Sequence, residues 1–202
     1  MEHTILRPDA TSEDIDAALE VAVRLGCHGL VVQPYWVAHV KDAPLPIISV
    51  AGFPYGTDPG ELKARAAAWA VDQGAREIDI VLNLGALRSG EDDVVAADIA
   101  AVRGAISGVT LKVILETGLL TEAETKRAAH ICTMEGADFL KTSTGVLSRG
   151  ATVEDVQLLK PFNLVKASGG IRIWEQAAAL VAAGAERLGT SASEEILAGA
   201  PA

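Results

Sequence analysis

The stretch that decides the fold is MEGADFLKTSTG, residues 134–145. A glycine stands where a helix would end, an alanine and an aspartate follow, and the next apolar run stops at Lys141 and small polar residues. The same opening of glycine, alanine and a charged residue precedes apolar runs at residues 74–76 and 184–186. A repeated unit of helix, glycine and short buried strand indicates an alternating β/α fold.

Short apolar runs alternate with amphipathic segments along the whole chain. We expect strands at eight such runs: His3–Leu6, Gly29–Val32, Ile47–Gly52, Glu77–Leu82, Leu111–Glu116, Asp138–Thr142, Leu164–Ser168 and Arg187–Gly189. We expect the intervening helices at Ser12–Leu25, Pro34–His39, Pro59–Gln73, Val94–Ala105, Glu122–Met134, Val153–Leu159, Trp174–Ala183 and Ser193–Leu197. Eight β/α units in 202 residues predict a single, compact (β/α)8 TIM barrel that forms one domain over residues 1–202.

An open, doubly wound α/β sheet is the alternative architecture. Such a sheet would be expected to carry a glycine-rich nucleotide loop after an early strand. Neither the G-x-G-x-x-G pattern nor a P-loop pattern occurs in the chain, so the barrel is favoured.

The composition excludes several classes of function. Half of the residues are hydrophobic, which supports a full core and argues against disorder. The net charge of −10 argues against nucleic acids and anionic membrane surfaces as partners, so a phosphate ligand would need local N–H groups and a few basic side chains. The start of the chain has no signal-peptide pattern and no apolar stretch reaches membrane length, so we expect a cytoplasmic protein.

Cysteine and histidine do not suggest a metal site. Cys27 and Cys132 fall in or beside predicted helices without metal-type spacing, and we expect both to be reduced structural thiols. The four histidines are scattered, whereas a zinc-dependent mechanism would be expected to show a cluster. We therefore expect neither a metal nor another cofactor.

Two lysines end consecutive apolar strands. Lys141 and Lys166 are each followed by small hydroxyl residues and glycine. Because burying an unpaired ammonium costs several kcal/mol, two lysines at the carboxyl ends of neighbouring strands indicate a shared chemical site. The chemistry of a buried lysine is amine attack on a carbonyl to give a Schiff base, and the residues alone do not decide which lysine is the nucleophile.

Further polar residues are expected to point into the same interior. Alternation places Asp79 and Asn83 inward in the fourth strand, and Lys112 and Glu116 inward in the fifth. A second ammonium and a dry pocket would both lower the pKa of a nucleophilic lysine. The carboxylate of Asp79 would offset the cost of burying the lysine charges and would move protons. The competing interpretation is a buried ion-pair network that only fixes the fold, and Lys112 and Glu116 fit either interpretation.

The loops after the last two strands suggest an anion site. Ser168–Arg172 and Gly189–Ser191 each lead into a predicted helix, and barrels commonly bind phosphate through N–H groups of these loops. Gly169 and Gly170 would let the backbone approach an anion closely. Arg172 fits either a phosphate contact or a surface position.

The chain resembles the 2-deoxyribose-5-phosphate aldolases, class I aldolases of the DeoC type. The segments that carry the resemblance span nearly the whole chain in the expected order: His3–Pro8, Gly52–Gly56, Glu77–Val81, Lys112–Thr117, Phe139–Gly145 and Lys166–Arg172. The motifs around Lys141 and Lys166 are highly specific when they occur together. The resemblance implies a (β/α)8 barrel that reversibly cleaves 2-deoxy-D-ribose 5-phosphate to D-glyceraldehyde 3-phosphate and acetaldehyde, without a cofactor.

The resemblance also implies roles for individual residues. Lys141 would form the Schiff base, Lys166 would perturb it and join proton transfer, and Asp79 would shuttle protons with a water. Lys112 and Glu116 are expected to support the site. Contacts to the substrate and its phosphate are expected from Thr144, Gly169, Gly170, Arg172, Gly189 and Ser191. Relatives are often dimers, and a homodimer is one option here.

Some positions depart from the usual family pattern. Glu2 stands where an aspartate is usual, which leaves its contact with the lysines open. The loop Val146–Arg149 is not the commonest form, and Arg149 would be within reach of the phosphate. The chain ends at Ala202 without the tail tyrosine that some relatives use in proton transfer, so we expect slower or water-dependent turnover.

Two other functions are weighed against this one. The altered loop Val146–Arg149 would suit Schiff-base chemistry on another small aldehyde or phosphosugar. A sugar-phosphate-binding barrel without catalysis is the non-enzymatic alternative, and the presence of Lys141, Lys166 and Asp79 together argues against it.

Overall fold

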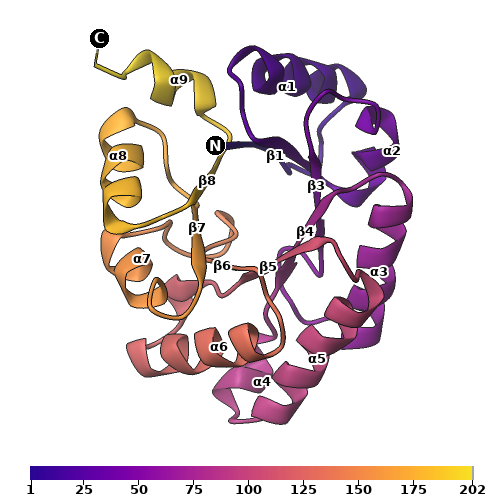
Figure 1. The fold of residues 1–202 in the computed structure, drawn as a ribbon, viewed down its shortest axis with the longest axis vertical. Coiled ribbons are helices and arrows are strands. Elements are labelled where there is room, and N and C mark those ends of the chain that lie inside the picture. Colours follow the sequence, from indigo (N-terminus) through magenta and orange to yellow (C-terminus); the bar gives the residue numbers. More distant parts are fainter. Residues whose placement is uncertain (202) are drawn as a thin grey trace.

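Eight parallel strands close into a barrel in chain order in the computed structural model, which describes residues 1–201 (Figure 1). The strands are β1 Glu2–Ile5, β2 Gly29–Val32, β3 Ile47–Ala51, β4 Glu77–Val81, β5 Thr110–Ile114, β6 Phe139–Lys141, β7 Leu164–Ser168 and β8 Arg187–Thr190. The barrel closes where β8 pairs with β1, with Gly189 opposite Glu2. The predicted (β/α)8 barrel is confirmed.

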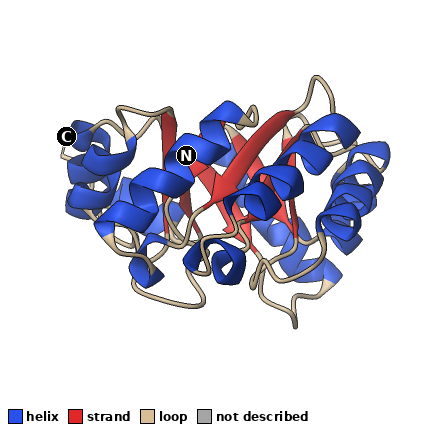
Figure 2. Cartoon of the chain, turned by 90° about the horizontal axis from the view of Figure 1, so that it is seen from below, coloured by secondary structure: helices blue, strands red, loops and turns tan. Residues whose placement is uncertain are grey.

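Helices form a ring around the strands, and the side view shows the strands enclosed by them (Figures 1 and 2). The α-helices are α1 Ser12–Arg24, α2 Val37–Val40, α3 Gly60–Asp72, α4 Leu84–Arg88, α5 Asp92–Ala105, α6 Glu122–Met134, α7 Val153–Leu159, α8 Trp174–Ala183 and α9 Ser193–Ala198. Two short 3-10 helices lie at η1 Pro34–Trp36 and η2 Thr117–Leu119. Within residues 1–201, no helix is both long and apolar enough to cross a membrane.

Local sequence explains where several helices begin and end. Thr11, Thr121 and Thr152 each accept a hydrogen bond from the backbone N–H three residues later, and an acidic side chain at that position bonds back. Such capping boxes satisfy N–H groups that the first turn leaves unpaired. Gly184 ends α8 in the left-handed conformation, which glycine adopts without steric cost.

Two predictions at strand ends are wrong in detail. The sequence does not reveal α4, and Asn83 is the N-cap of this helix, where its Oδ1 accepts from the Ala86 N–H at 3.1 Å, instead of an inward strand residue. Strand β5 ends at Ile114, and Glu116 adopts the left-handed conformation with φ of 52°. Strand alternation therefore does not extend to Glu116, and its side chain must be placed by other contacts.

The two faces of the strands carry different chemistry. Residues such as Ile78 and Ile80 belong to the main core between barrel and helices, where Cys27 and Cys132 are also buried as free thiols. A separate apolar cluster inside the barrel consists of Val31, Ile48 and Val50, with Leu6 and Phe53 packed against it. In register, Val50 lies opposite Asp79. The barrel interior thus has an apolar part at β2 and β3, and its charged part runs from β4 round to Glu2 of β1.

Candidate active site

Asp79 is the centre of the charged interior. Its carboxylate is fully buried, and the register places it opposite Lys112 on β5. Oδ1 accepts from Lys112 Nζ at 3.0 Å. Oδ2 accepts from Lys141 Nζ at 2.8 Å and from Lys166 Nζ at 2.7 Å. One carboxylate therefore binds three ammonium groups from three strands, as the inward alternation of Asp79 and Lys112 predicts.

Lys141 and Lys166 are register partners on β6 and β7. Lys166 is fully buried, whereas Lys141 is 3% exposed and lines a pocket of about 780 Å³ at the carboxyl ends of the strands. Of the three lysines on Asp79, Lys141 is the one that lines this pocket. The structure therefore distinguishes two lysines that the local sequence leaves equivalent.

The surroundings of Lys141 favour its neutral form. Burial lowers the pKa of Lys141 to about 8, and the ammonium of Lys166 acts in the same direction, while Asp79 opposes both. The pKa of Asp79 behaves differently: burial alone would raise it, but Lys112, Lys141 and Lys166 outweigh that effect and hold it well below its ordinary value. The site thus combines an amine that can be neutral near physiological pH with a carboxylate that stays ionised.

Glu2, which stands where the family usually has the shorter aspartate, contacts the lysines. Its Oε2 accepts from Lys166 Nζ, and its Oε1 accepts from Arg187 at 3.0 Å and lies 3.6 Å from Lys112 Nζ. The open question of the Glu2 contact is therefore answered: the longer side chain joins the network. Glu2, His28 and Glu77 have ligand atoms close enough to hold a metal ion, but Arg187 and Lys112 already pair with these carboxylates. This cluster is an ion-pair group.

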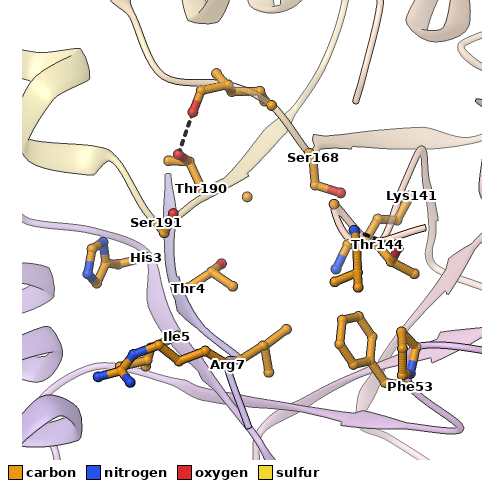
Figure 3. Close-up of a pocket in the computed structure, with 18 of the residues that line it drawn as sticks. His3, Thr4, Ile5, Arg7, Phe53, Lys141, Thr144, Ser168, Thr190 and Ser191 are labelled. Carbon is orange, nitrogen blue, oxygen red and sulfur yellow. Dashed lines mark hydrogen bonds between the residues drawn. The ribbon is translucent and has the colours of Figure 1, made fainter. Parts of the chain in front are cut away.

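The predicted phosphate-side residues line the pocket together with Lys141. They come from β8 and from the loops after β6, β7 and β8: Thr144, Gly169, Gly170, Arg172, Gly189 and Ser191. In Figure 3, Lys141 and Thr144 lie on one side of the pocket, and His3 and Ser191 lie on the opposite side. The pocket therefore brings the Lys141 amine together with three glycines, Gly169, Gly170 and Gly189, and the serine and threonine hydroxyl groups of the same loops.

Gly189 has a packing role that sequence analysis missed. A Cβ at this position would lie 2.9 Å from Lys166 Cε and 3.2 Å from Ser168 Cβ. The 2.9 Å separation is shorter than real Cβ contacts, so a larger residue at position 189 would push Lys166 Cε from its place beside Asp79. The signal was the glycine in β8, since glycine within a strand often marks a close approach.

The structure places Glu116 away from the lysines. Its carboxylate accepts from Thr144 N at 2.9 Å, from Thr144 Oγ1 at 2.5 Å and from the Ser148 hydroxyl. The Thr144 hydroxyl gives its single proton to Glu116 and accepts from the Val146 N–H at 3.1 Å. Thr144 therefore cannot donate that proton to a substrate while this bond persists. Glu116 organises the loop after β6.

Arg149 pairs with an acidic side chain at the start of α7. Its guanidinium pairs with both carboxylate oxygens of Asp155, with Nη1 at 2.5 Å and Nη2 at 2.9 Å. Asp155 is the residue that completes the capping box of α7 with Thr152. Arg149 thus joins the loop to the start of α7, and the structure does not place it among the residues that line the pocket.

Sequence analysis did not name the residues on the β1 and β3 side of the pocket as contacts. These lining residues include His3, Thr4, Arg7, Gln33, Phe53 and Tyr55. His3 Nδ1 lies 3.0 Å from Ser193 Oγ, which ties β1 to the start of α9. The available signal was their presence in two segments that carry the resemblance, His3–Pro8 and Gly52–Gly56.

Fold and site together define a class: a (β/α)8-barrel protein with a candidate active site built on buried lysines of neighbouring strands. Comparison with known proteins gives the family. Residues 1–195 match the DeoC/LacD family aldolases, and the chain belongs to this family. Its members are aldolases, which are lyases, so this protein is an enzyme of that type.

Relatives match over nearly the full length. The chain is 46% identical to the deoxyribose-phosphate aldolase of a Thermus thermophilus strain, covering 98% of this chain and 94% of that protein. It is 45% identical to the deoxyribose-phosphate aldolase of Brevibacillus brevis, covering 99% and 94%.

Solved structures agree with this assignment. The aldolase QR15 superimposes with a TM-score of 0.94 at 38% identity, covering 97% of this chain and 91% of that one. The deoxyribose phosphate aldolase of Aeropyrum pernix, a tetramer, gives a TM-score of 0.90 at 34% identity, covering 98% and 87%.

Proposed function

We propose that this aldolase reversibly cleaves 2-deoxy-D-ribose 5-phosphate to D-glyceraldehyde 3-phosphate and acetaldehyde, with Lys141 as the Schiff-base lysine. The observation that carries the proposal is the position of Lys141. It is buried, hydrogen-bonded to Asp79, and reaches a pocket that Gly169, Gly170 and Gly189 also line. The choice of substrate is supported by relatives that match nearly the whole chain and are named deoxyribose-phosphate aldolase.

The first step is attack of neutral Lys141 Nζ on the C1 aldehyde of the sugar phosphate. The carbinolamine that results loses water to give an iminium ion. With a pKa of about 8, roughly one tenth of Lys141 is neutral at pH 7, compared with less than one thousandth of an unperturbed lysine. Lys166 and Asp79 adjoin Lys141 and are the groups that would move protons in this step.

The iminium ion then drives carbon–carbon cleavage. The C3 hydroxyl loses its proton, the C2–C3 bond breaks, and its electron pair moves toward the iminium nitrogen to form an enamine. D-Glyceraldehyde 3-phosphate leaves, the enamine is protonated at C2, and hydrolysis releases acetaldehyde and free Lys141. Binding of the phosphate by N–H groups of Gly169 and Gly170, with Ser191, would hold C1 at Lys141.

Trapping of the Schiff base tests the proposal. The protein is incubated with acetaldehyde, reduced with borohydride, digested and mapped by peptide mass spectrometry. We expect the reduced adduct at Lys141, and we expect Lys141→Met to lose both the adduct and turnover of deoxyribose 5-phosphate. Lys63→Met is a matched control, because Lys63 is also a fully buried, ion-paired lysine but lies on α3 with Asp98 of α5 as its partner.

Specific results would contradict the proposal. An adduct at Lys166, or wild-type turnover by Lys141→Met, would remove Lys141 from the role of nucleophile. A panel of aldehydes and sugars with and without phosphate tests the substrate. A clear preference for another aldehyde or phosphosugar would favour Schiff-base chemistry on that substrate.

We also propose a cytoplasmic location and a homo-oligomeric assembly. The two free, buried cysteines are consistent with a reducing compartment. The tetramer described for the Aeropyrum pernix relative supports self-association, with the homodimer as the simplest form. Light scattering coupled to size exclusion measures the assembly directly, and a monomer would contradict the proposal.

A further inference from the structure

A second layer of charges lies below the proposed reaction site. Glu77, at the beginning of β4, accepts from Lys112 Nζ at 2.5 Å. Its other contacts are His28 Nε2 at 2.7 Å and Arg187 Nη1 at 3.4 Å. Lys112 is fully buried and bonds upward to Asp79. A continuous line of hydrogen bonds and ion pairs thus links the partly exposed His28 to Asp79 through Glu77 and Lys112.

The proposed reaction does not use this layer directly. Neither Glu77 nor Lys112 lines the pocket, so neither touches the substrate site. A buried ion pair is a poor stabiliser, because the cost of removing both charges from water offsets most of their attraction. A contribution to stability therefore does not explain why the Glu77–Lys112 pair is present.

We propose that Glu77 and Lys112 act as a positioning pair that fixes the Asp79 carboxylate beneath Lys141 and Lys166 and balances the charge of that site. This inference rests on the proposed Schiff-base function of Lys141. The geometry gives the pair its effect, since Lys112 occupies Oδ1 of Asp79 and leaves Oδ2 for the other two lysines. Glu77 in turn holds the ammonium of Lys112 in place from below.

Both members of the pair stay charged over the working range of pH. Burial alone would raise the pKa of Glu77, but Lys112 outweighs it and lowers that pKa to about 2. Burial alone would lower the pKa of Lys112, but Asp79, Glu2 and Glu77 outweigh it and raise that pKa. The pair therefore adds no net charge near Lys141, and neither of its members titrates in the pH range in which Lys141 does.

The charged and titratable groups around the pair come from several elements. Glu77 faces Lys112 of β5, Arg187 of β8 and the imidazole of His28 just before β2, and Lys112 also lies 3.6 Å from Glu2 of β1. Above them, Lys141 faces Asp79 of β4 and Lys166 of β7, with the carboxylate of Glu2 nearby. Removing one charge from this closed set must change the protonation balance of Lys141.

The two single variants should shift that balance in opposite directions. Glu77→Gln leaves the cation of Lys112 uncompensated, which disfavours ammonium at Lys141 and moves its titration to lower pH by about one unit. Lys112→Met removes a cation and frees an oxygen of Asp79, which moves the titration to higher pH by about the same amount. The double variant removes a neutral pair and should return toward wild type.

The experiment is a double-mutant cycle read by the pH dependence of trapping. The initial rate of adduct formation at Lys141 with acetaldehyde and cyanoborohydride is measured from about pH 5.5 to 9.5, a range that contains the pKa of about 8. Rates are compared between variants at each pH, so the pH dependence of the reagent cancels. Asp98→Asn is the matched control, because it breaks the buried Lys63–Asp98 pair outside the barrel and should leave the profile unchanged.

The conservative variant Glu77→Asp keeps the charge and should keep the wild-type titration. Profiles of Glu77→Gln and Lys112→Met that both coincide with wild type would overturn the inference, and a lower urea midpoint in these variants would then show a purely structural pair. If Glu77→Gln does not fold, Lys112→Met and the double variant decide by the same criterion. A wild-type protein that forms no lysine adduct overturns the proposed function itself, which distinguishes the two failures.

Discussion

Residue 189 shows how one atom can decide the geometry of the site. The space that a Cβ would fill at Gly189 is taken by Lys166 Cε, 2.9 Å from the ideal position. Lys166 in turn is held in this position by hydrogen bonds to Asp79 and Glu2. A side chain at position 189 must therefore displace the lysine or the strand.

Gly189→Ala should reduce turnover without removing Lys141 from the pocket. We expect kcat to fall on the order of tenfold to a hundredfold, because misplacement of a proton-transfer group by about 1 Å has effects of that size. The adduct at Lys141 should still form, more slowly. Steady-state kinetics and adduct mapping check this expectation. A wild-type kcat would mean that Lys166 has room to move or takes no part in proton transfer.

At the scale of elements, the end of β5 and the loop after β6 form one unit. Glu116 leaves the strand in the left-handed conformation, which is uncommon for a residue other than glycine and often marks a functional constraint. Its carboxylate then holds both donors of Thr144 and the hydroxyl of Ser148. A second attachment, from Arg149 to Asp155, fixes the far end of the loop to α7. Together they shape the pocket wall near Lys141.

Glu116→Ala should weaken substrate binding more than chemistry. The change leaves the donors of Thr144 and Ser148 without their buried acceptor, and we expect KM to rise on the order of tenfold with a smaller change in kcat. Glu116→Gln is the matched control: its amide oxygen still accepts from Thr144, and the Ser148 hydroxyl can turn to accept from the amide nitrogen. Kinetics of both variants test the idea, and a fall in kcat at constant KM would instead place Glu116 in the chemical step.

At the scale of the whole molecule, the buried carboxylates make the barrel sensitive to acid. The pKa values of Glu2, Glu77 and Asp79 are all lowered, in each case because buried lysines outweigh the effect of burial. A carboxylate whose pKa is lower in the folded state stabilises the protein above its unfolded pKa and loses that contribution as pH falls. Burial raises the pKa of Asp98, which acts in the opposite direction but is a single group.

The urea midpoint should therefore fall between about pH 5 and about pH 3, where unfolded carboxylates take up protons that the folded ones resist. Glu77→Gln should reduce the slope of this fall, because it removes one of the groups whose pKa is lowered. Urea titrations at several pH values, followed by circular dichroism, measure the effect. Equal midpoints at pH 6 and pH 3 would contradict it.

The architecture and the chemical character of the site follow from local sequence patterns. Periodic apolar runs and glycine ends act over a few residues, which is why the eight strands and the two lysines could be predicted locally. Inward alternation also predicted Asp79 and Lys112, since the side-chain period of a strand is fixed.

Local sequence does not reveal which lysine lines the pocket, where Glu116 and Arg149 form their hydrogen bonds, or how Glu77 supports Asp79 through Lys112. Each of these contacts depends on the register between strands that are distant in sequence. Each also depends on whether a buried side chain reaches the pocket wall or stops a few ångströms short of it. Glu116 departs from prediction because β5 ends at Ile114, and no local pattern marks that end. Contacts between groups more than twenty residues apart, such as Glu116 with Thr144, exist only after the barrel has closed.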